Sequence, residues 1–290
     1  MNNIKTFENF NNKDIFTYIE NNDIQSVKDY INSGYNLDKQ NNIGETVLIR
    51  AVINDKIEIV KLLLNAGIDI EKQDNDGNTA LIHAATLYNR IKIVKLLLNA
   101  GADTDKQDNF GNTALIYASI YNNIKTVKLL LDAGADIDKQ DNDGYTTLIW
   151  ASRNNKIEIV KILLNAGAYI DKQTNNGDTA LIKASRYDNI EIVELLLNSG
   201  SNIDKQNNSG NNALIIAAYY NYREIIKLLL DYGADEFILD SNDKSFYDLL
   251  NTENKKYFTQ KYPTSVYNAI YHNYKKSFTE FVKDYNIKNN

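Results

Sequence analysis

Apolar residues along the chain fall into two kinds of segment that alternate. In the first clear copy, Leu48, Ile49, Val52 and Ile53 follow the i, i+1, i+4, i+5 spacing of one helix face. Thr46 stands just before this segment. Its hydroxyl oxygen can accept a hydrogen bond from a free backbone amide in the first turn of a helix. The pattern predicts a short helix over residues 47–54 that begins after Thr46.

The second kind of segment is apolar on most of its surface. In residues 57–65 the polar side chains Glu58, Lys61 and Asn65 are three and four positions apart, which places them on one stripe of a helix. Gly67 follows, at the position where a left-handed backbone conformation closes many helices. We therefore expect a second helix that neighbouring elements cover on all but one side.

An Asn or Asp separates the two segments of every pair. These residues recur every 33 positions, with one gap of 34. Only Gly, Asn and Asp routinely adopt the left-handed conformation, so we expect each to have a positive φ between two antiparallel helices. The residues are Asn22, Asp55, Asn89, Asn122, Asn155, Asp188 and Asn221.

Two series of glycines share this period. One closes the loop before each first segment: Gly44, Gly77, Gly111, Gly144, Gly177 and Gly210. The other follows each second segment: Gly34, Gly67, Gly101, Gly134, Gly167, Gly200 and Gly233. Self-similarity at this period indicates a solenoid of stacked repeats rather than one or two ordinary domains.

The repeated motif G-x-T-A-L-I-x-A, followed by I-V-K-L-L-L-x-x-G-A-D, resembles the ankyrin repeat. The resemblance covers roughly residues 11–250. It implies a β-turn and two antiparallel helices per repeat, stacked into a curved solenoid. The chain has Val, Ala or Thr in place of the proline of the family's T-P-L-H motif, and Ile in place of its histidine. Since Ala is a good helix former and Ile supplies apolar volume, these departures leave the expected fold intact.

We therefore predict an all-α fold, an ankyrin-repeat solenoid with capping repeats and a C-terminal amphipathic helix. Residues 1–40 are the predicted N-terminal capping repeat, and residues 240–262, with Asp243 at the loop-glycine position, are the C-terminal one. Six repeats lie between them, at 41–73, 74–107, 108–140, 141–173, 174–206 and 207–239.

Two further local features are expected. The repeat 74–107 has one extra residue near "ATLYN", which predicts a longer turn or a π-type bulge. In the tail, residues 263–290, an apolar residue recurs every four positions, which predicts one more amphipathic helix. These tail residues are Val266, Ile270, Tyr274, Phe278 and Val282.

The acidic loop "DKQDNDG", residues 138–144, does not fit a calcium or phosphate site. An EF-hand loop needs an acidic first ligand and a Glu six residues after the glycine, but those positions hold Lys139 and Trp150. A phosphate loop needs several glycines and a lysine entering a helix, and acidic side chains repel phosphate. The loop also recurs in every repeat, which favours a structural turn.

Composition narrows the function classes. The chain has no Cys and only two His, His83 and His272, which excludes thiolate metal sites and disulfides and argues against a catalytic zinc. We expect no cofactor, no metal and no enzymatic activity. The N-terminus lacks the apolar region of a secretory signal, and no apolar run is long enough to span a membrane. We expect a cytoplasmic protein, in its own cell or a host cell, and a monomer.

Charge argues against nucleic acid as a partner. The net charge is −6, and residues from 251 onward hold seven Lys against three acidic residues, so the rest of the chain carries about −10. An acidic body does not attract a polyanion. The basic tail is expected to be a solvated helix face, with contact to an acidic partner as the alternative.

Candidate binding residues stand where the repeat leaves the residue type free. At the ends of the first helices, the resemblance implies an exposed, concave side. The chain has aromatic residues and arginines there, and it has Trp150 at the free position x of the motif T-A-L-I-x-A; these are the types enriched in binding hot spots. The candidates are Tyr121, Trp150, Arg153, Arg186, Tyr187, Tyr219 and Tyr220. Trp150 and Tyr117 could equally fill space between repeats, and His83 is expected to be a packed imidazole.

The predicted function is a non-catalytic scaffold or adaptor that binds a protein partner through this groove. Two alternatives stay open. The segment "YPTSVYNAI", residues 262–270, is faintly similar to the start of F-box-like segments that recruit ubiquitin ligases. An enzyme with an ankyrin arm is the other alternative, although the residues outside the repeats are too few for a second folded domain.

Overall fold

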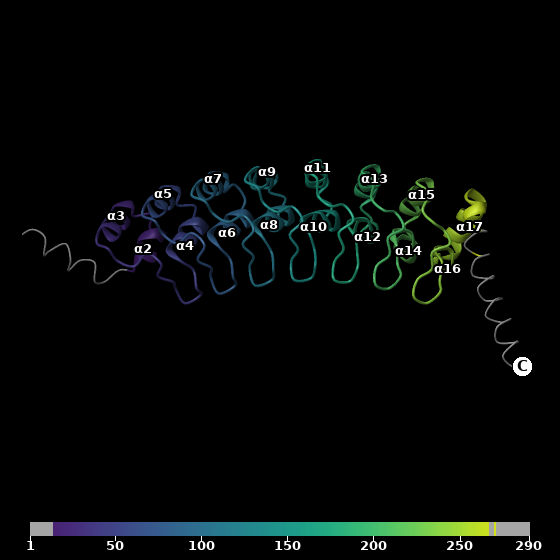
Figure 1. The fold of residues 1–290 in the computed structure, drawn as a ribbon, viewed down its shortest axis with the longest axis horizontal. Helices are drawn as coiled ribbons and strands as arrows, with labels where there is room; N and C mark the ends of the chain where they lie inside the picture. Colours follow the sequence, from purple (N-terminus) through teal and green to yellow (C-terminus); the bar gives the residue numbers. More distant parts are fainter. Residues whose placement is uncertain (1–13, 267–269, 271–290) are drawn as a thin grey trace, which may run out of the picture. The chain divides into compact units, whose positions relative to one another are not determined.

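The computed structural model describes residues 14–266 and residue 270. The chain divides between Asn142 and Asp143 into two compact units. Each unit consists of pairs of short helices joined by long loops (Figure 1). Within the described residues there is no β-strand, and the only ladder pairing is an isolated bridge between Gln40 and Thr46.

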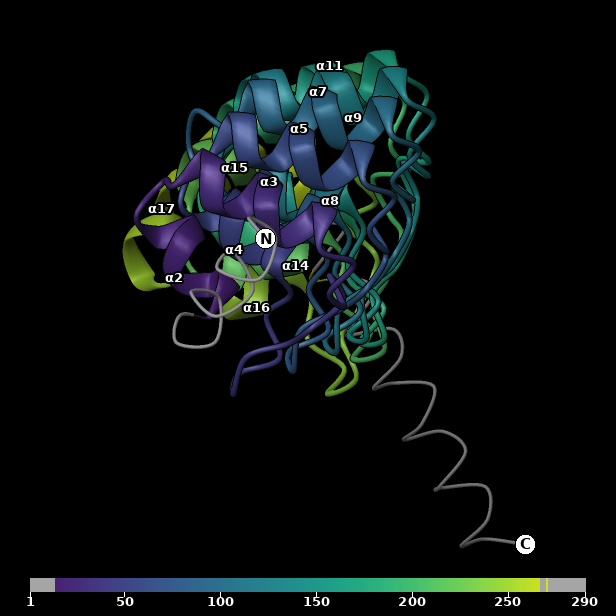
Figure 2. The same cartoon turned by 90° about the vertical axis from the view of Figure 1, so that its left-hand side faces the viewer.

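The first unit contains four helix pairs. The first helices of the pairs pack in order along one row, and the second helices along another. Figure 2 shows the second helices α5, α7 and α9 in one layer. The helices are α2 (Ile15–Glu20), α3 (Ile24–Asn32), α4 (Val47–Ile53), α5 (Ile57–Asn65), α6 (Ala80–Thr86), α7 (Ile91–Asn99), α8 (Ala114–Ile120) and α9 (Ile124–Asp132).

The second unit repeats this arrangement. The first helices α10, α12, α14 and α16 pack in order, and the second helices α11, α13 and α15 form the neighbouring row. The helices are α10 (Thr147–Arg153), α11 (Ile157–Asn165), α12 (Ala180–Arg186), α13 (Ile190–Asn198), α14 (Ala213–Tyr219), α15 (Arg223–Asp231), α16 (Phe246–Leu249) and α17 (Thr252–Lys261).

Each first helix of the six repeats begins at a capping side chain, as predicted for Thr46. The Thr46 hydroxyl oxygen accepts a hydrogen bond of 3.1 Å from the backbone amide of Ile49. The same bond recurs one repeat further on, and in the last repeat Asn212 replaces threonine. Because this bond satisfies an amide that the helix leaves free, it fixes where the apolar segment becomes helical.

A residue with a left-handed backbone follows each first helix from α2 to α14, two or three positions after the helix ends, and the predicted positive φ is confirmed at all seven Asn and Asp positions. Their φ angles lie between 54° at Asn155 and 64° at Asn89. The same conformation occurs at Asp243, where φ is 60° at the position of the loop glycine. The turns at the seven Asn and Asp positions reverse the chain, which then forms the second helix of each pair.

The core lies between the two rows of helices. Leu48, Ile49 and Val52 are fully buried, as predicted, while Ile53 at the end of α4 is only half-buried. The helix-face pattern omitted Val47 and Ala51, which are also fully buried because neighbouring first helices cover both sides of α4. On α5 the predicted polar stripe of Glu58, Lys61 and Asn65 is exposed.

The acidic residues of the loops close turns. Asp74 Oδ1 accepts hydrogen bonds from the backbone amides of Asp76, at 3.0 Å, and Asn78, at 2.8 Å. Gly77 follows the turn with φ 83°, and a Cβ there would lie 2.6 Å from the backbone nitrogen of Asn109 in the next loop. The repeated acidic loop is therefore a turn that lets successive loops approach closely, and glycine is needed for that approach.

The extra residue of the repeat 74–107 lengthens a turn. Helix α6 ends at Thr86, and Leu87 has extended backbone angles, φ −92° and ψ 134°. The equivalent residue in the first repeat, Asn54, is close to helical, with φ −85° and ψ 8°. The longer turn is therefore the outcome, and α6 contains no π-type bulge.

The chain ends are only partly described. Helices α2 and α3 lie within the predicted N-terminal capping repeat, and α16 and α17 within the C-terminal one. Their capping role stays a prediction. The predicted tail helix, 263–290, lies outside the described residues except for 263–266 and 270. Of the F-box-like segment, 262–270, residues 267–269 lie outside them.

Candidate protein-binding surface

Five of the six candidate residues of the second unit stand at the ends of first helices, and the sixth, Trp150, lies in the middle of α10. Arg153 ends α10, Arg186 ends α12 and Tyr219 ends α14. Tyr187 and Tyr220 are the C-cap residues that follow. The second residue after each helix end has a positive φ, so the chain turns there. These residues are Asn155, Asp188 and Asn221. The repeat geometry thus places one aromatic or arginine residue after another at the same structural position.

Arg153 lies between two aromatic rings. Its guanidinium carbon is 5.0 Å from the ring centroid of Trp150 and 5.3 Å from that of Tyr187. Trp150 belongs to the same helix, whereas Tyr187 caps α12 of the next repeat. Both contacts are within the range at which a cation is attracted to an aromatic face. Arg153 therefore contacts aromatic rings of two consecutive repeats.

Trp150 also contacts Tyr145, which in turn lies beside a buried ion pair. The rings of Tyr145 and Trp150 have centroids 4.6 Å apart. Lys183 Nζ lies 5.0 Å from the centroid of Tyr145 and 2.6 Å from Asp178 Oδ2. The side chains of Lys183 and Asp178 are only 8% and 5% exposed. Lys183 is thus a buried positive charge with its own carboxylate.

Arg186 is held more loosely than Lys183. Its nearest carboxylate oxygen is Asp178 Oδ1, 3.9 Å from its terminal nitrogen. That oxygen already accepts a hydrogen bond of 2.6 Å from the Asn207 side-chain amide. The Nε of Arg186 is buried and makes no hydrogen bond. The side chain as a whole is 28% exposed.

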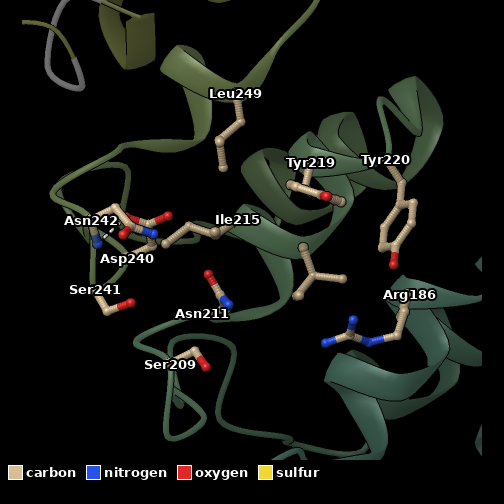
Figure 3. Close-up of a pocket in the computed structure, with 11 residues that line it drawn as sticks. Arg186, Ser209, Asn211, Ile215, Tyr219, Tyr220, Asp240, Ser241, Asn242 and Leu249 are labelled. Atoms are coloured by element: carbon tan, nitrogen blue, oxygen red, sulfur yellow. Dashed lines mark hydrogen bonds between the residues drawn. The ribbon is translucent and has the colours of Figure 1, made fainter.

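A pocket of about 370 Å³ adjoins Arg186. Figure 3 shows the guanidinium pointing into it from α12, with Asn211 and Ser209 of a loop below and Tyr219 and Tyr220 of α14 above. The two tyrosines are 64% and 41% exposed, and their rings are edge to face at 5.1 Å. The pocket thus combines polar loop atoms with exposed aromatic surface.

The remaining candidate, Tyr121, lies in the first unit. It caps α8 and is 55% exposed. Its ring stacks on Tyr117 with centroids 6.3 Å apart. Tyr117 in turn donates a hydrogen bond of 2.6 Å to Asp108 Oδ2. Burial, and next the bond to Asp108, raise the pKa of Tyr117 well above its usual value.

A regular side-chain pairing escaped the sequence reasoning. In several repeats the side chain at the free position x of the T-A-L-I-x-A motif contacts an acidic or hydrogen-bonding partner in the loop that precedes it. The pairs are Arg50 with Glu45 at 3.2 Å, His83 with Asp74 at 2.7 Å, Tyr117 with Asp108 at 2.6 Å, and Lys183 with Asp178 at 2.6 Å. The signal in the sequence was an acidic residue five or nine positions before x. His83 is therefore a packed, hydrogen-bonded imidazole, as expected.

Trp150 holds this same position x, and Asp141 stands nine positions before it. It packs on Tyr145 and on Arg153. Trp150 therefore packs against residues of its own repeat, and its part in binding stays a prediction.

The described part of the chain contains neither a metal-binding cluster nor a membrane-spanning helix. Within residues 14–266, no cluster of three or more His, Asp or Glu side chains has the geometry to hold a metal ion. No helix within these residues is long and apolar enough to cross a membrane.

Each unit is therefore a stack of helix–turn–helix–loop repeats, which is the class of solenoid repeat proteins. A family model described as ankyrin repeats (three copies) matches residues 15–108, 85–174 and 167–240. The chain belongs to the ankyrin repeat family. Ankyrin repeats are generally modules for protein–protein interaction.

A solved structure agrees with this assignment. The "Crystal structure of the ankyrin repeat domain of Bcl-3: a unique member of the IkappaB protein family" is similar, with a TM-score of 0.70 and 30% identity. The match covers 76% of this chain and 99% of that one. No curated protein sequence matches the chain.

Proposed function

We propose that this protein is a non-catalytic scaffold or adaptor. It binds a protein partner through the aromatic–arginine surface, by which we mean Trp150, Arg153, Arg186, Tyr187, Tyr219 and Tyr220 of the second unit. Tyr121 is the counterpart of this surface in the first unit. On this proposal the protein acts as a monomer in the cytoplasm and needs no cofactor.

One observation carries the proposal: large side chains are held in fixed positions at the surface although the fold does not need them there. Tyr219 is 64% exposed, and Tyr187 is 44% exposed while its ring faces Arg153. Exposed aromatic area is a common mark of contact surfaces. Side chains that are already ordered lose little entropy on binding, so such a surface favours affinity.

The test needs the natural partner. Affinity purification of the intact chain from its own cell or host, followed by mass spectrometry, identifies candidates. The dissociation constant of the purified partner is then measured with the wild type and with Arg186→Ala/Tyr187→Ala. If these are hot-spot residues, the double variant loses about 2 kcal/mol or more of binding free energy.

The matched control is Glu158→Ala/Lys161→Ala. Both residues are exposed, on the polar stripe of α11. We expect this variant to bind like the wild type. A partner that depends on Glu158 and Lys161, and not on the aromatic–arginine surface, would refute the proposal.

A further inference from the structure

Two of the five arginines lack a close carboxylate. Within the described residues, three arginines form close ion pairs: Arg50 with Glu20 at 2.5 Å, Arg90 with Asp55 at 3.3 Å, and Arg223 with Glu253 at 2.6 Å. Arg153 has no ion pair there, and Arg186 has only the 3.9 Å approach to Asp178. These two arginines occupy the same position of consecutive repeats, 33 residues apart.

The carboxylates near Arg153 and Arg186 do not neutralise the charges of these two arginines. Asp178 has the buried ammonium of Lys183 as its close partner. Asp240 lines the pocket on the side opposite Arg186 (Figure 3), and its Oδ1 accepts hydrogen bonds from the backbone amides of Asn242 and Lys244. A negative ligand group beside the arginines would therefore meet positive charge that no close internal partner cancels.

The form of the two guanidinium groups favours carboxylate. The guanidinium of Arg153 lies over the rings of Trp150 and Tyr187, and neither ring can neutralise its charge as a carboxylate would. The planar fork of N–H donors matches the two oxygens of a carboxylate, which Lys cannot do in the same way. Figure 3 shows Arg186 aimed into a pocket that also offers the side chains of Asn211 and Ser209.

The spacing of the two arginines limits the shape of the ligand. They end α10 and α12, which pack directly against each other, and packed helices lie about 8–10 Å apart. In a polyproline II segment, residues i and i+3 lie on the same side and about 9 Å apart. One extended segment can therefore present a carboxylate to each arginine.

We propose that the aromatic–arginine surface recognises an extended segment of the partner that carries two acidic residues three positions apart, one bound by Arg153 and the other by Arg186. This rests on the proposed function and adds the chemistry of the partner. A nucleic-acid strand also offers anions and stacking bases. Phosphates at every nucleotide, however, would face a chain body with a net charge of about −10.

Trp150 makes the test direct, because it is the only tryptophan of the chain and lies against Arg153. The full-length protein is titrated with the peptide Pro-Pro-Glu-Pro-Pro-Glu-Pro-Pro while tryptophan emission is recorded. Two matched peptides serve as controls. One has Gln in place of both Glu, and the other has the two Glu adjacent, so that they leave different sides of the segment.

The expected result is that the acidic peptide with i, i+3 spacing binds at least about 10-fold more tightly than the glutamine peptide. It should also bind more tightly than the peptide with adjacent Glu. Arg153→Gln and Arg186→Gln should each remove most of this preference. Arg223→Gln, which alters an arginine that already has a carboxylate, should leave it unchanged.

Three outcomes would overturn the inference: equal binding of the acidic and glutamine peptides, no binding of either at about 1 mM, or tighter binding of single-stranded oligothymidine than of any peptide. The proposed function is judged separately. A natural partner that needs Tyr187 and Arg186, but binds without any acidic segment, would keep the protein-binding role and refute only the acidic recognition.

Discussion

Replacing Lys183 by methionine tests the buried charge pair beneath the aromatic–arginine surface. Methionine keeps an unbranched apolar side chain and removes the ammonium that lies 2.6 Å from Asp178 Oδ2. The Asp178 carboxylate is then left at 5% exposure. Its close remaining donor is the Asn207 side-chain amide at 2.6 Å.

The cost follows from the desolvation of that carboxylate. Removing one partner of a buried ion pair costs about 3–5 kcal/mol. Arg186, 3.9 Å away, can move toward Asp178, which places the expected loss near the lower limit, at about 3 kcal/mol. In a protein of this size class, that corresponds to about 6–12 °C in Tm. The double variant Asp178→Asn/Lys183→Met has no buried charge, so we expect it within about 1 kcal/mol of the wild type.

Urea unfolding, followed by helical circular dichroism and by Trp150 emission, measures these differences, provided that the m-values agree. The control is Lys161→Met, which removes an exposed lysine 3.4 Å from Glu191 and should cost less than about 0.5 kcal/mol. The reasoning is wrong if Lys183→Met is as stable as the control variant. It is also wrong if the double variant is no more stable than Lys183→Met.

Four further variants test stability and are checked by the same unfolding assay. Gly167→Ala should cost about 1–2 kcal/mol, because φ is 87° there but a Cβ meets no atom. Gly144→Ala should cost a further 1–3 kcal/mol or so, because its Cβ would lie 2.6 Å from the backbone of the next loop; equal costs would contradict this. Tyr117→Phe should cost about 1–2 kcal/mol at pH 8 by removing the bond to Asp108. Since the folded state raises the pKa of Tyr117, its contribution is complete below about pH 10 and is lost as the pH rises further, so the two proteins should converge there; a gap that widens with pH would contradict this. Leu163→Ala should cost about 2–5 kcal/mol, because Leu163 is fully buried; a loss below about 1 kcal/mol would count against the assigned core.

Local rules were sufficient for the backbone of the repeat. The caps such as Thr46 and the positive φ at residues such as Asn155 each depend on one side chain and its neighbours, so the sequence predicts them directly. The same holds for the polar stripe of α5. The sequence located the extra residue near Leu87 but could not predict its conformation, because a longer turn and a π-type bulge accommodate one residue equally well.

The side-chain network of the site could be predicted only in part. The sequence placed Arg153, Arg186 and Tyr187 at the ends of first helices, which the structure confirms. It could not show that Arg153 lies between Trp150 and Tyr187, because this contact joins two repeats and depends on their relative rotation. Nor did it show that Lys183 is buried, since a lysine at a variable position is normally solvated.

Site-specific photo-crosslinking tests the central claim most directly. Tyr219 is replaced by p-benzoylphenylalanine in one protein and Glu158 in another, and each is irradiated in extract of the cell that contains the partner. Tyr219 is exposed on the aromatic–arginine surface, and Glu158 is exposed on α11. We predict a discrete protein crosslinked from position 219, lost when Arg186 and Tyr187 are also replaced by Ala, and none from position 158. A partner crosslinked from position 158 and not from 219 would contradict the proposed binding surface.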